Sequence, residues 1–493
     1  MKKIILLQVF LFCLCGFLKA QFAQDYPFKT YVDNSGFLYV TGDTIINETT
    51  KYIITKKYDS LLNLKWKKFL VNPQGYDKGL DIIVEENSPS SVYVTGNYYD
   101  NSKKKNSIIT IKYNGDNGDT IWTKTVDDFR ESKGFGIALD EAQNVYVGGY
   151  ITGEKGRKDF LSIKYDLDGN QEWLNTSNFS RFLEDDVATD ILVDEGYVYL
   201  MGYAYQGPDY MNDLLLVSYE KSGAFSSSKF YKKTNTDEYP TGFAFANLSR
   251  SPITKSRTVV IGHSDNPANN NVSDILTICF NNDMMTNVLW SDVYNNDIYN
   301  GNDIATAVTA NNQGTQIYVT GYSENGSTGK DFVTIKYRVS EKNREWVNFF
   351  DYPSKTPGND RASSVLIKED SLYVTGSCDR APNGFWMVKY PVSGSNPPVN
   401  ESWSNTFIPS FLNGREPGTY NSAAILGMDT TGNIINFYMG WNNEFKSYAA
   451  QKFDPNGNVL YTLDPDLKNS LSIPGINKAN LKKTNIKTEQ FKD

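Results

Sequence analysis

The acidic residues between positions 185 and 190 are the strongest candidates for chemistry in this chain. Asp185, Asp186 and Asp190 lie on or beside one expected inner strand. Glycoside hydrolysis uses two carboxyl groups, one as general acid and the other as base or nucleophile. Acids from other parts of the chain could complete such a pair, and spacing along the sequence cannot reveal it. We interpret these three residues as a solvated rim and keep carbohydrate chemistry as the alternative.

A second group of oxygen donors could bind calcium. Asp166, Asp168 and Asn170 place side-chain oxygens at alternate positions, as a loop for a hard cation does. No glutamate at the twelfth position completes an EF-hand, and the stretch coincides with a turn that recurs along the chain. We therefore interpret it as a turn and expect no bound metal.

The single histidine narrows the remaining chemistry. Serine and cysteine triads ordinarily need a positioned imidazole, and histidine-rich zinc sites need several. His263 stands where other copies of a repeat carry Tyr150, Tyr203 and Tyr322, so we interpret it as a variant at a repeat position. No Walker-type phosphate loop is present. We expect no catalytic residue and no bound cofactor.

One repeated phrase organises the chain. Its clearest copy runs through Ile317–Gly321, then Asp331–Tyr337, then Trp346. A glycine that we take to end the second strand of each copy recurs every 53 to 64 residues or so, as Gly42, Gly96, Gly149, Gly202, Gly262, Gly321, Gly376 and Gly440. Units of this length suit four-stranded blades. The fold predicted is all-β, a β-propeller of eight four-stranded blades, or of seven if the copy at 28–70 packs irregularly.

Within each copy we expect four strands of different character. The first is rich in small residues, as in Ile304–Val308, and the third alternates and ends on a basic and aromatic pair such as Lys336 and Tyr337. An Asp, Asn and Gly turn then leads to an outer strand that begins with tryptophan, at Trp66, Trp122, Trp173, Trp290, Trp346 and Trp403. Copies four and eight lack it. Function is expected where copies differ, at 205–211, 266–271 and 405–420.

These phrases resemble a known repeat. Tyr318–Tyr322, Asp331–Tyr337 and Trp346 resemble the SBBP-type β-propeller repeats of exported proteins from Bacteroidetes-like bacteria, over about 28–463. The spacing from Gly118 to Trp122 is also similar to that of tryptophan-docking eight-bladed propellers. That second group includes quinoprotein dehydrogenases and scaffold propellers of outer-membrane assembly. The resemblance therefore implies a fold and leaves two classes of function open.

Composition and the chain ends indicate export. Residues 1–20 have a basic start, an apolar stretch and a small final residue, which is the pattern of a signal peptide. We expect the propeller over 21–463 and a mobile Lys-rich tail over 464–493, with no transmembrane segment after cleavage. The formal net charge of −8 argues against nucleic acid. Cys279 and Cys378 are expected to be buried thiols.

The sequence thus predicts a non-enzymatic, exported propeller that serves the bacterial envelope as a protein-binding or assembly module. Such a protein could be an accessory of a secretion or outer-membrane complex, and would bind another envelope protein through one face. We expect it in the periplasm or at the outer membrane, with secretion or the cell surface as the alternative. The rival functions are a propeller enzyme, either a quinone-type dehydrogenase or a carbohydrate-active protein, and an adhesin that binds glycans.

Overall fold

A computed structural model describes most of the chain between residues 24 and 463. The described ranges are 24–47, 50–72, 75–86, 90–126, 129–153, 156–181, 184–208, 211–247, 256–266, 272–281, 288–351, 358–379, 384–392, 403–407, 421–441 and 446–463. These residues form 32 strands and no helix. None of them therefore forms a helix able to cross a membrane. The expected signal peptide and Lys-rich tail lie outside the described residues, as do 267–271 and 408–420.

Four consecutive strands form each blade, which makes eight blades from the described residues. Blades 1 to 4 comprise β1 (Gln24–Val32), β2 (Leu38–Asn47), β3 (Thr50–Tyr58), β4 (Leu64–Leu70); β5 (Lys78–Glu85), β6 (Ser91–Asp100), β7 (Lys105–Asn114), β8 (Thr120–Val126); β9 (Glu131–Leu139), β10 (Val145–Thr152), β11 (Lys158–Tyr165), β12 (Gln171–Ser177); β13 (Asp186–Val193), β14 (Tyr197–Tyr205), β15 (Asn212–Glu220) and β16 (Phe225–Tyr231).

Blades 5 to 8 follow the same plan. They comprise β17 (Asp237–Asn247), β18 (Ser256–Asn266), β19 (Val272–Asn281), β20 (Val288–Tyr294); β21 (Asp303–Ala310), β22 (Gln316–Asn325), β23 (Gly329–Arg338), β24 (Asn343–Phe350); β25 (Gly358–Lys368), β26 (Ser371–Cys378), β27 (Gly384–Pro391), β28 (Trp403–Phe407); β29 (Asn421–Met428), β30 (Ile434–Trp441), β31 (Lys446–Phe453) and β32 (Val459–Leu463). Blades 6 and 7 are also joined by a short parallel pairing of β23 with β25.

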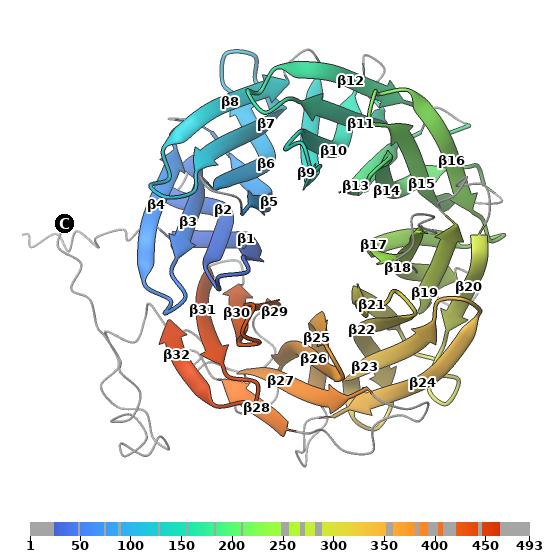
Figure 1. Ribbon diagram of the computed structural model, residues 1–493. Coiled ribbons are helices and arrows are strands. Elements are labelled where there is room, and N and C mark those ends of the chain that lie inside the picture. Colours follow the sequence, from blue (N-terminus) through green and yellow to red (C-terminus); the bar gives the residue numbers. More distant parts are fainter. Residues whose placement is uncertain are drawn as a thin grey trace, which may run out of the picture.

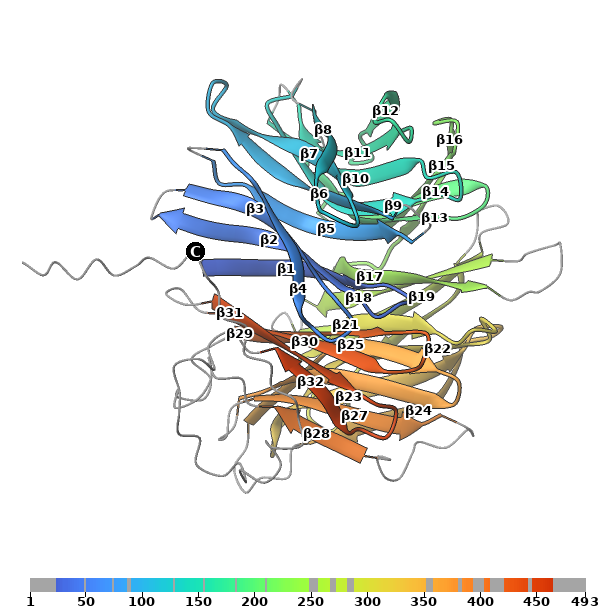
Figure 2. The same cartoon turned by 60° about the vertical axis from the view of Figure 1, so that its left-hand side comes forward.

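The blades stand around a central axis with their first strands innermost (Figure 1), and the view in Figure 2 shows the inner strands running along that axis. The eight-bladed prediction is confirmed, with the first copy forming a regular blade. Apolar side chains between neighbouring blades make the core, as where Ile53 of blade 1 packs in one cluster with Val94 of blade 2.

The repeated tryptophan and lysine join several blades to the next. Lys57 and Trp66 of blade 1 both donate to the Gly115 carbonyl in blade 2, at 2.8 and 3.0 Å. Lys112 and Trp122 do the same to a carbonyl in blade 3. Each Trp ring also packs on a turn glycine of the next blade. A Cβ built on Gly118, Gly169 or Gly223 would lie only 2.7 to 2.9 Å from the tryptophan ring of the preceding blade.

Blade 4 lacks both members of this pair. Ser218 and Ser227 stand opposite each other where blades 1, 2, 3, 6 and 7 have lysine and tryptophan, and their hydroxyl groups lie 3.0 Å apart. The joint between blades 4 and 5 is therefore built differently from its neighbours.

The ring closes through the same kind of contact. Lys452 of blade 8 donates to the Ser60 carbonyl of blade 1 at 3.0 Å and pairs with Asp429 at 2.9 Å. Tyr448 adds hydrogen bonds to Lys56 and Tyr58 of blade 1. Each blade keeps its own four strands, so the ring closes without an exchanged strand.

The repeated glycine does not end the second strand, contrary to the prediction. Gly321 lies in the middle of β22, which continues to Asn325. The glycine is needed because the inner strand bulges opposite it and brings a backbone carbonyl against its Cα. A Cβ on Gly321 would lie less than 3.0 Å from the Ile304 oxygen, and the same is true of Gly96, Gly149, Gly202, Gly262 and Gly376 with their own partners.

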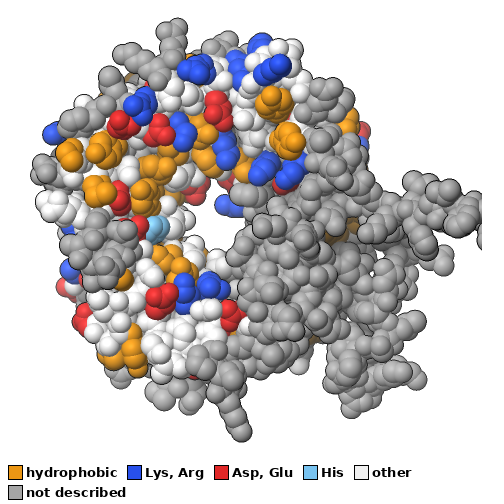
Figure 3. All heavy atoms as spheres, turned by 180° about the vertical axis from the view of Figure 1, so that it is seen from behind, with side chains coloured by type: hydrophobic (Ala, Val, Ile, Leu, Met, Phe, Trp, Pro, Cys, Tyr) orange, Lys and Arg blue, Asp and Glu red, His pale blue; other side chains and the backbone are white. Residues whose placement is uncertain are grey.

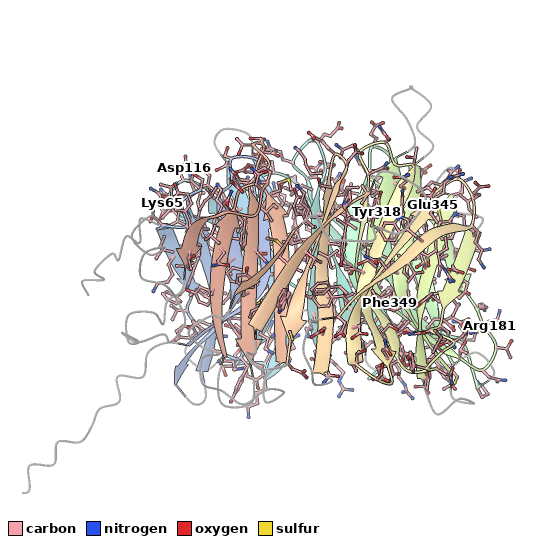
Figure 4. All side chains as sticks on the ribbon, turned by 90° about the horizontal axis from the view of Figure 1, so that it is seen from below. Lys65, Asp116, Arg181, Tyr318, Glu345 and Phe349 are labelled. Carbon is pink, nitrogen blue, oxygen red and sulfur yellow. The ribbon has the colours of Figure 1, made fainter. Side chains whose placement is uncertain are left out.

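The ring has two faces. The turn face carries the hairpin turns that join first to second and third to fourth strands. The connection face carries the loops between second and third strands and the links from blade to blade. Figure 4 shows Lys65 and Asp116 on the turn face and Arg181 on the connection face.

Candidate functional site

The residue that directly follows the bulge can be compared between the inner strands. The inner strands can be aligned by the residue that pairs with the repeated glycine of the second strand. In seven of the eight described inner strands, the residue directly after this paired residue is the bulge. The next residues are Lys29, Asp81, Gly136, Asp190, Gly242, Ala307 and Ser364. Charge is thus confined to blades 1, 2 and 4, on one side of the channel.

Asp81 and Asp190 flank Gly136 of the blade between them. The Ile137 N–H of blade 3 donates to Asp81 Oδ2 at 2.9 Å. A Cβ on Gly136 would lie 2.7 Å from Asp190 Oδ1, so glycine is what leaves space for this carboxylate. Lys29 Nζ lies 3.5 Å from Asp81 Oδ1. We call these residues the channel triad: Lys29, Asp81 and Asp190.

The three charges of the channel triad influence one another. Burial raises the pKa of Asp190 to about 6, while Lys29 lowers it and Asp81 raises it. The pKa of Lys29 is raised, chiefly by the charge of Asp81 and further by Asp190, although burial opposes this. Asp190 can therefore gain or lose a proton near neutral pH, as a general acid or base must.

The structure separates the three acids that the sequence grouped. Asp186 is buried at the start of β13, where its Oδ2 accepts hydrogen bonds from the N–H groups of Phe179 and Ser180. Asp185 forms an ion pair with Lys158 at 3.1 Å. Asp190 alone joins the channel triad, and its carboxylate neighbour there is Asp81, which the sequence did not suggest.

A buried pair of carboxyl groups lies at the unusual joint of blades 4 and 5. Asp213 and Glu238 are both fully buried. Burial raises the pKa of Asp213 to about 7 and that of Glu238 to about 8, and the Asp213 charge contributes to the second shift. Lys232 lies 3.9 Å from Asp213 and donates to Gln206, a residue of the variable stretch 205–211. Stretch 205–211 thus borders a polar cluster, as a departure from the repeat suggested.

Three further acids gather where blades 6 and 7 are joined. Asp331, Asp351 and Asp360 can each bring one oxygen within 4.8 Å of the others. Asp331 accepts hydrogen bonds from Thr328 at 2.7 Å and Asn325 at 3.1 Å. Burial raises the pKa of Asp331, and the charges of Asp351 and Asp360 add to this. These contacts tie the group to the loops of the connection face.

The other candidates have structural surroundings. Asp166 accepts hydrogen bonds from Asp168 and Asn170 within its own turn, so its oxygens are used there. His263 lies opposite Tyr239 with ring centroids 5.6 Å apart, and burial lowers its pKa against the effect of nearby Asp265. Cys279 and Cys378 are both buried, and neither forms a disulfide.

Comparisons with known proteins support the fold alone. No family model and no curated protein sequence matches the chain. Quinohemoprotein alcohol dehydrogenase from Comamonas testosteroni is similar in structure, with a TM-score of 0.52 and 11% identity over 85% of this chain and 71% of that one. Its counterpart ADHIIG from Pseudomonas putida HK5 gives 0.51, 11%, 85% and 71%. The chain thus has the fold of these β-propeller proteins.

Sequence reasoning missed Lys29 and Asp81. In its own blade, each occupies the position that Asp190 occupies in blade 4, two residues after the one that pairs with the repeated glycine. Comparing the residues at this position in all copies would have revealed them. The obstacle was the bulge, which shifts the register by one residue and is not marked by any constant residue type.

Proposed function

We propose that this protein is an exported, non-enzymatic binding module of the bacterial envelope and that it binds a protein partner through its connection face. The observation that carries the proposal is a set of exposed apolar side chains on blade-to-blade links. Ile298 is 81% exposed and Val71 63% exposed, and Tyr299 and Tyr76 beside them are also exposed. Apolar and aromatic side chains on ordered loops suit a protein partner.

The positions of these side chains indicate how a partner would sit. Val71 and Tyr76 belong to the link between blades 1 and 2, and Ile298 and Tyr299 to the link between blades 5 and 6. These links lie on opposite sides of the ring (Figure 1). A partner that contacts both would lie across the mouth of the channel.

The turn face offers less for binding because its polar groups serve the ring. The backbone carbonyls of Gly115 and Leu167 accept from the preceding blade, and side chains such as Asp140 and Asp166 accept from their own turns. Leu61, Leu167 and Phe225 are exposed there, but the hairpin turn that carries or precedes each of them is already docked on a neighbouring blade.

The proposal is tested by purifying the tagged chain from its native envelope in mild detergent, followed by mass spectrometry. Wild type and the turn-face control Leu167→Asp should recover the same partner, and Ile298→Asp should lose it. If wild type recovers no partner, or if Ile298→Asp and Leu167→Asp recover it equally, the connection-face proposal is wrong.

A propeller enzyme is the second candidate, and the channel triad is the observation that favours it. Two carboxyl groups with different surroundings flank Gly136, and the pKa of Asp190 of about 6 suits proton transfer. The alternative predicts turnover of a sugar or alcohol that Asp190→Asn abolishes while leaving the melting temperature unchanged.

A further inference from the structure

Two lysines occupy the same position in neighbouring blades at the connection-face end of the channel. Lys78 of β5 and Lys133 of β9 each directly precede the residue paired with the repeated glycine. In the view from behind (Figure 3), Lys and Arg side chains gather above and to the right of the central opening, over blades 2 and 3. Both lysine side chains are partly exposed.

Neither ammonium group is neutralised. Among the residues that the structure describes, no carboxylate lies within 4.0 Å of Lys78 or Lys133. The Lys133 ammonium instead lies 4.5 Å from the centroid of the Phe135 ring. The third lysine nearby, Lys158, is already paired with Asp185 at 3.1 Å.

Two other cations act on the Lys133 ammonium group. Burial lowers the pKa of Lys133, and the charges of Lys78 and Lys158 lower it further, while Glu131 opposes them. Glu131 is engaged by Asn106, which donates to its Oε1 at 3.2 Å. An anion placed between the two free lysines would relieve their repulsion at little cost in existing contacts.

The charge of the whole chain limits what this anion can be. The chain carries a formal net charge of −8, so a long polyanion lying over the face would be repelled beyond the lysines. Screening restricts that repulsion to about 8 Å at physiological salt, so a compact group held at the mouth would feel mainly the lysines. The site therefore suits a compact acidic group, such as a small anion or a few adjacent acidic side chains.

We propose that Lys78 and Lys133 bind a ligand with at least two acidic groups at the connection-face mouth of the channel. The same chemistry is offered by an acidic segment of a protein partner and by a free organic polyacid. The inference rests on the proposed function only for the first of these sources, because a partner across the mouth would bring its acidic side chains to the lysines.

The test uses the purified full chain and isothermal titration calorimetry with two probes. One is tricarballylate, a free tricarboxylate, and the other is a capped hexaglutamate peptide. Variants are Lys78→Gln, Lys133→Gln and the double variant, with Lys65→Gln on the turn face as the matched control (Figure 4). Thermal melting of every variant checks that the ring stays folded.

Wild type and Lys65→Gln should bind at least one probe with equal affinity, and the double variant should bind it at least tenfold more weakly. Affinity should also fall as salt is raised. Tighter binding of hexaglutamate indicates a peptide source, and binding of tricarballylate alone indicates a free polyacid.

The proposal is overturned if neither probe binds wild type, or if the folded double variant binds as tightly as wild type. Equal weakening by Lys65→Gln would also overturn it, because a general charge effect would then explain the binding. A negative result here combined with partner loss in Ile298→Asp would refute the lysine site and leave the proposed function standing.

Discussion

Replacing Glu238 with glutamine should stabilise the ring, and increasingly so as the pH rises. Glu238 is fully buried in β17. Its Oε1 accepts hydrogen bonds from Thr236 and from Ser264, the latter at 3.0 Å. Its Oε2 is buried with no hydrogen-bond partner among the described residues. Glutamine resembles the protonated acid and cannot ionise, so it should keep these contacts without the cost of a buried charge.

The magnitude follows from the pKa values of the folded and unfolded states. Burial raises the pKa of Glu238 from 4.5 to about 8. Its contribution to stability is complete below the unfolded value of 4.5 and is lost as the pH rises through about 8. One pKa unit corresponds to about 1.4 kcal/mol, so the loss is roughly 1.4 kcal/mol at pH 5.5 and about 4 kcal/mol at pH 8. Glu238→Gln should recover about 3 kcal/mol more at pH 8 than at pH 5.5.

Glu345 provides a control with the opposite sign. Burial alone would raise the pKa of Glu345, but hydrogen bonds from Lys336 and Arg338 outweigh burial and lower it. Its ionised form therefore stabilises the ring above its unfolded pKa, and that contribution is lost as the pH falls. Glu345→Gln should destabilise the protein at pH 8.

The assay is the melting temperature and urea midpoint of wild type and both variants between pH 5.5 and 8. Opposite signs for the two variants at pH 8 are expected. If Glu238→Gln is less stable than wild type at pH 8, or if its advantage does not grow with pH, then Glu238 is not the buried, proton-binding group described here.

Three further outcomes are expected. Gly321→Ala should lower the urea midpoint strongly because its Cβ would meet a backbone carbonyl, whereas Gly242→Ala, whose Cβ would have 3.6 Å of space, should change it little. Trp122→Phe removes a 3.2 Å hydrogen bond to the Leu167 carbonyl, and equilibrium unfolding should show a loss of about 1 to 3 kcal/mol. Burial raises the pKa of the Cys279 thiol to about 12, so peptide mapping should find it labelled by iodoacetamide only after unfolding; labelling of the native ring would contradict its burial.

The blade plan could be predicted from the sequence because every blade needs the same local devices. Trp122 and Lys112 both donate to one carbonyl of the next blade, and every copy but the fourth carries a tryptophan or a lysine at the matching positions. The sequence correctly identified Gly321 as a repeated position, but it did not show why the residue there must be glycine. It serves a close approach of two strands, and only the pairing of β21 with β22 shows that.

The candidate sites were harder to predict because they depend on positions shared by different blades. Asp190 was identified, but Asp81 and Lys29 lie more than 100 residues away in the sequence and approach it on the same side of the channel. Asp185 and Asp186 are neighbours of Asp190 in sequence and yet serve Lys158 and the backbone near β13. Residues far apart in the sequence are therefore close in the fold, and neighbours in the sequence serve different contacts.

The central claim is that the connection face binds a protein partner across the channel mouth. It is tested most directly by placing a photoreactive amino acid at position 298 or at position 167 and irradiating intact cells. The account predicts a cross-linked partner from Ile298 on the connection face and none from Leu167 on the turn face. Cross-linking from position 167 alone, or from neither position, would contradict it.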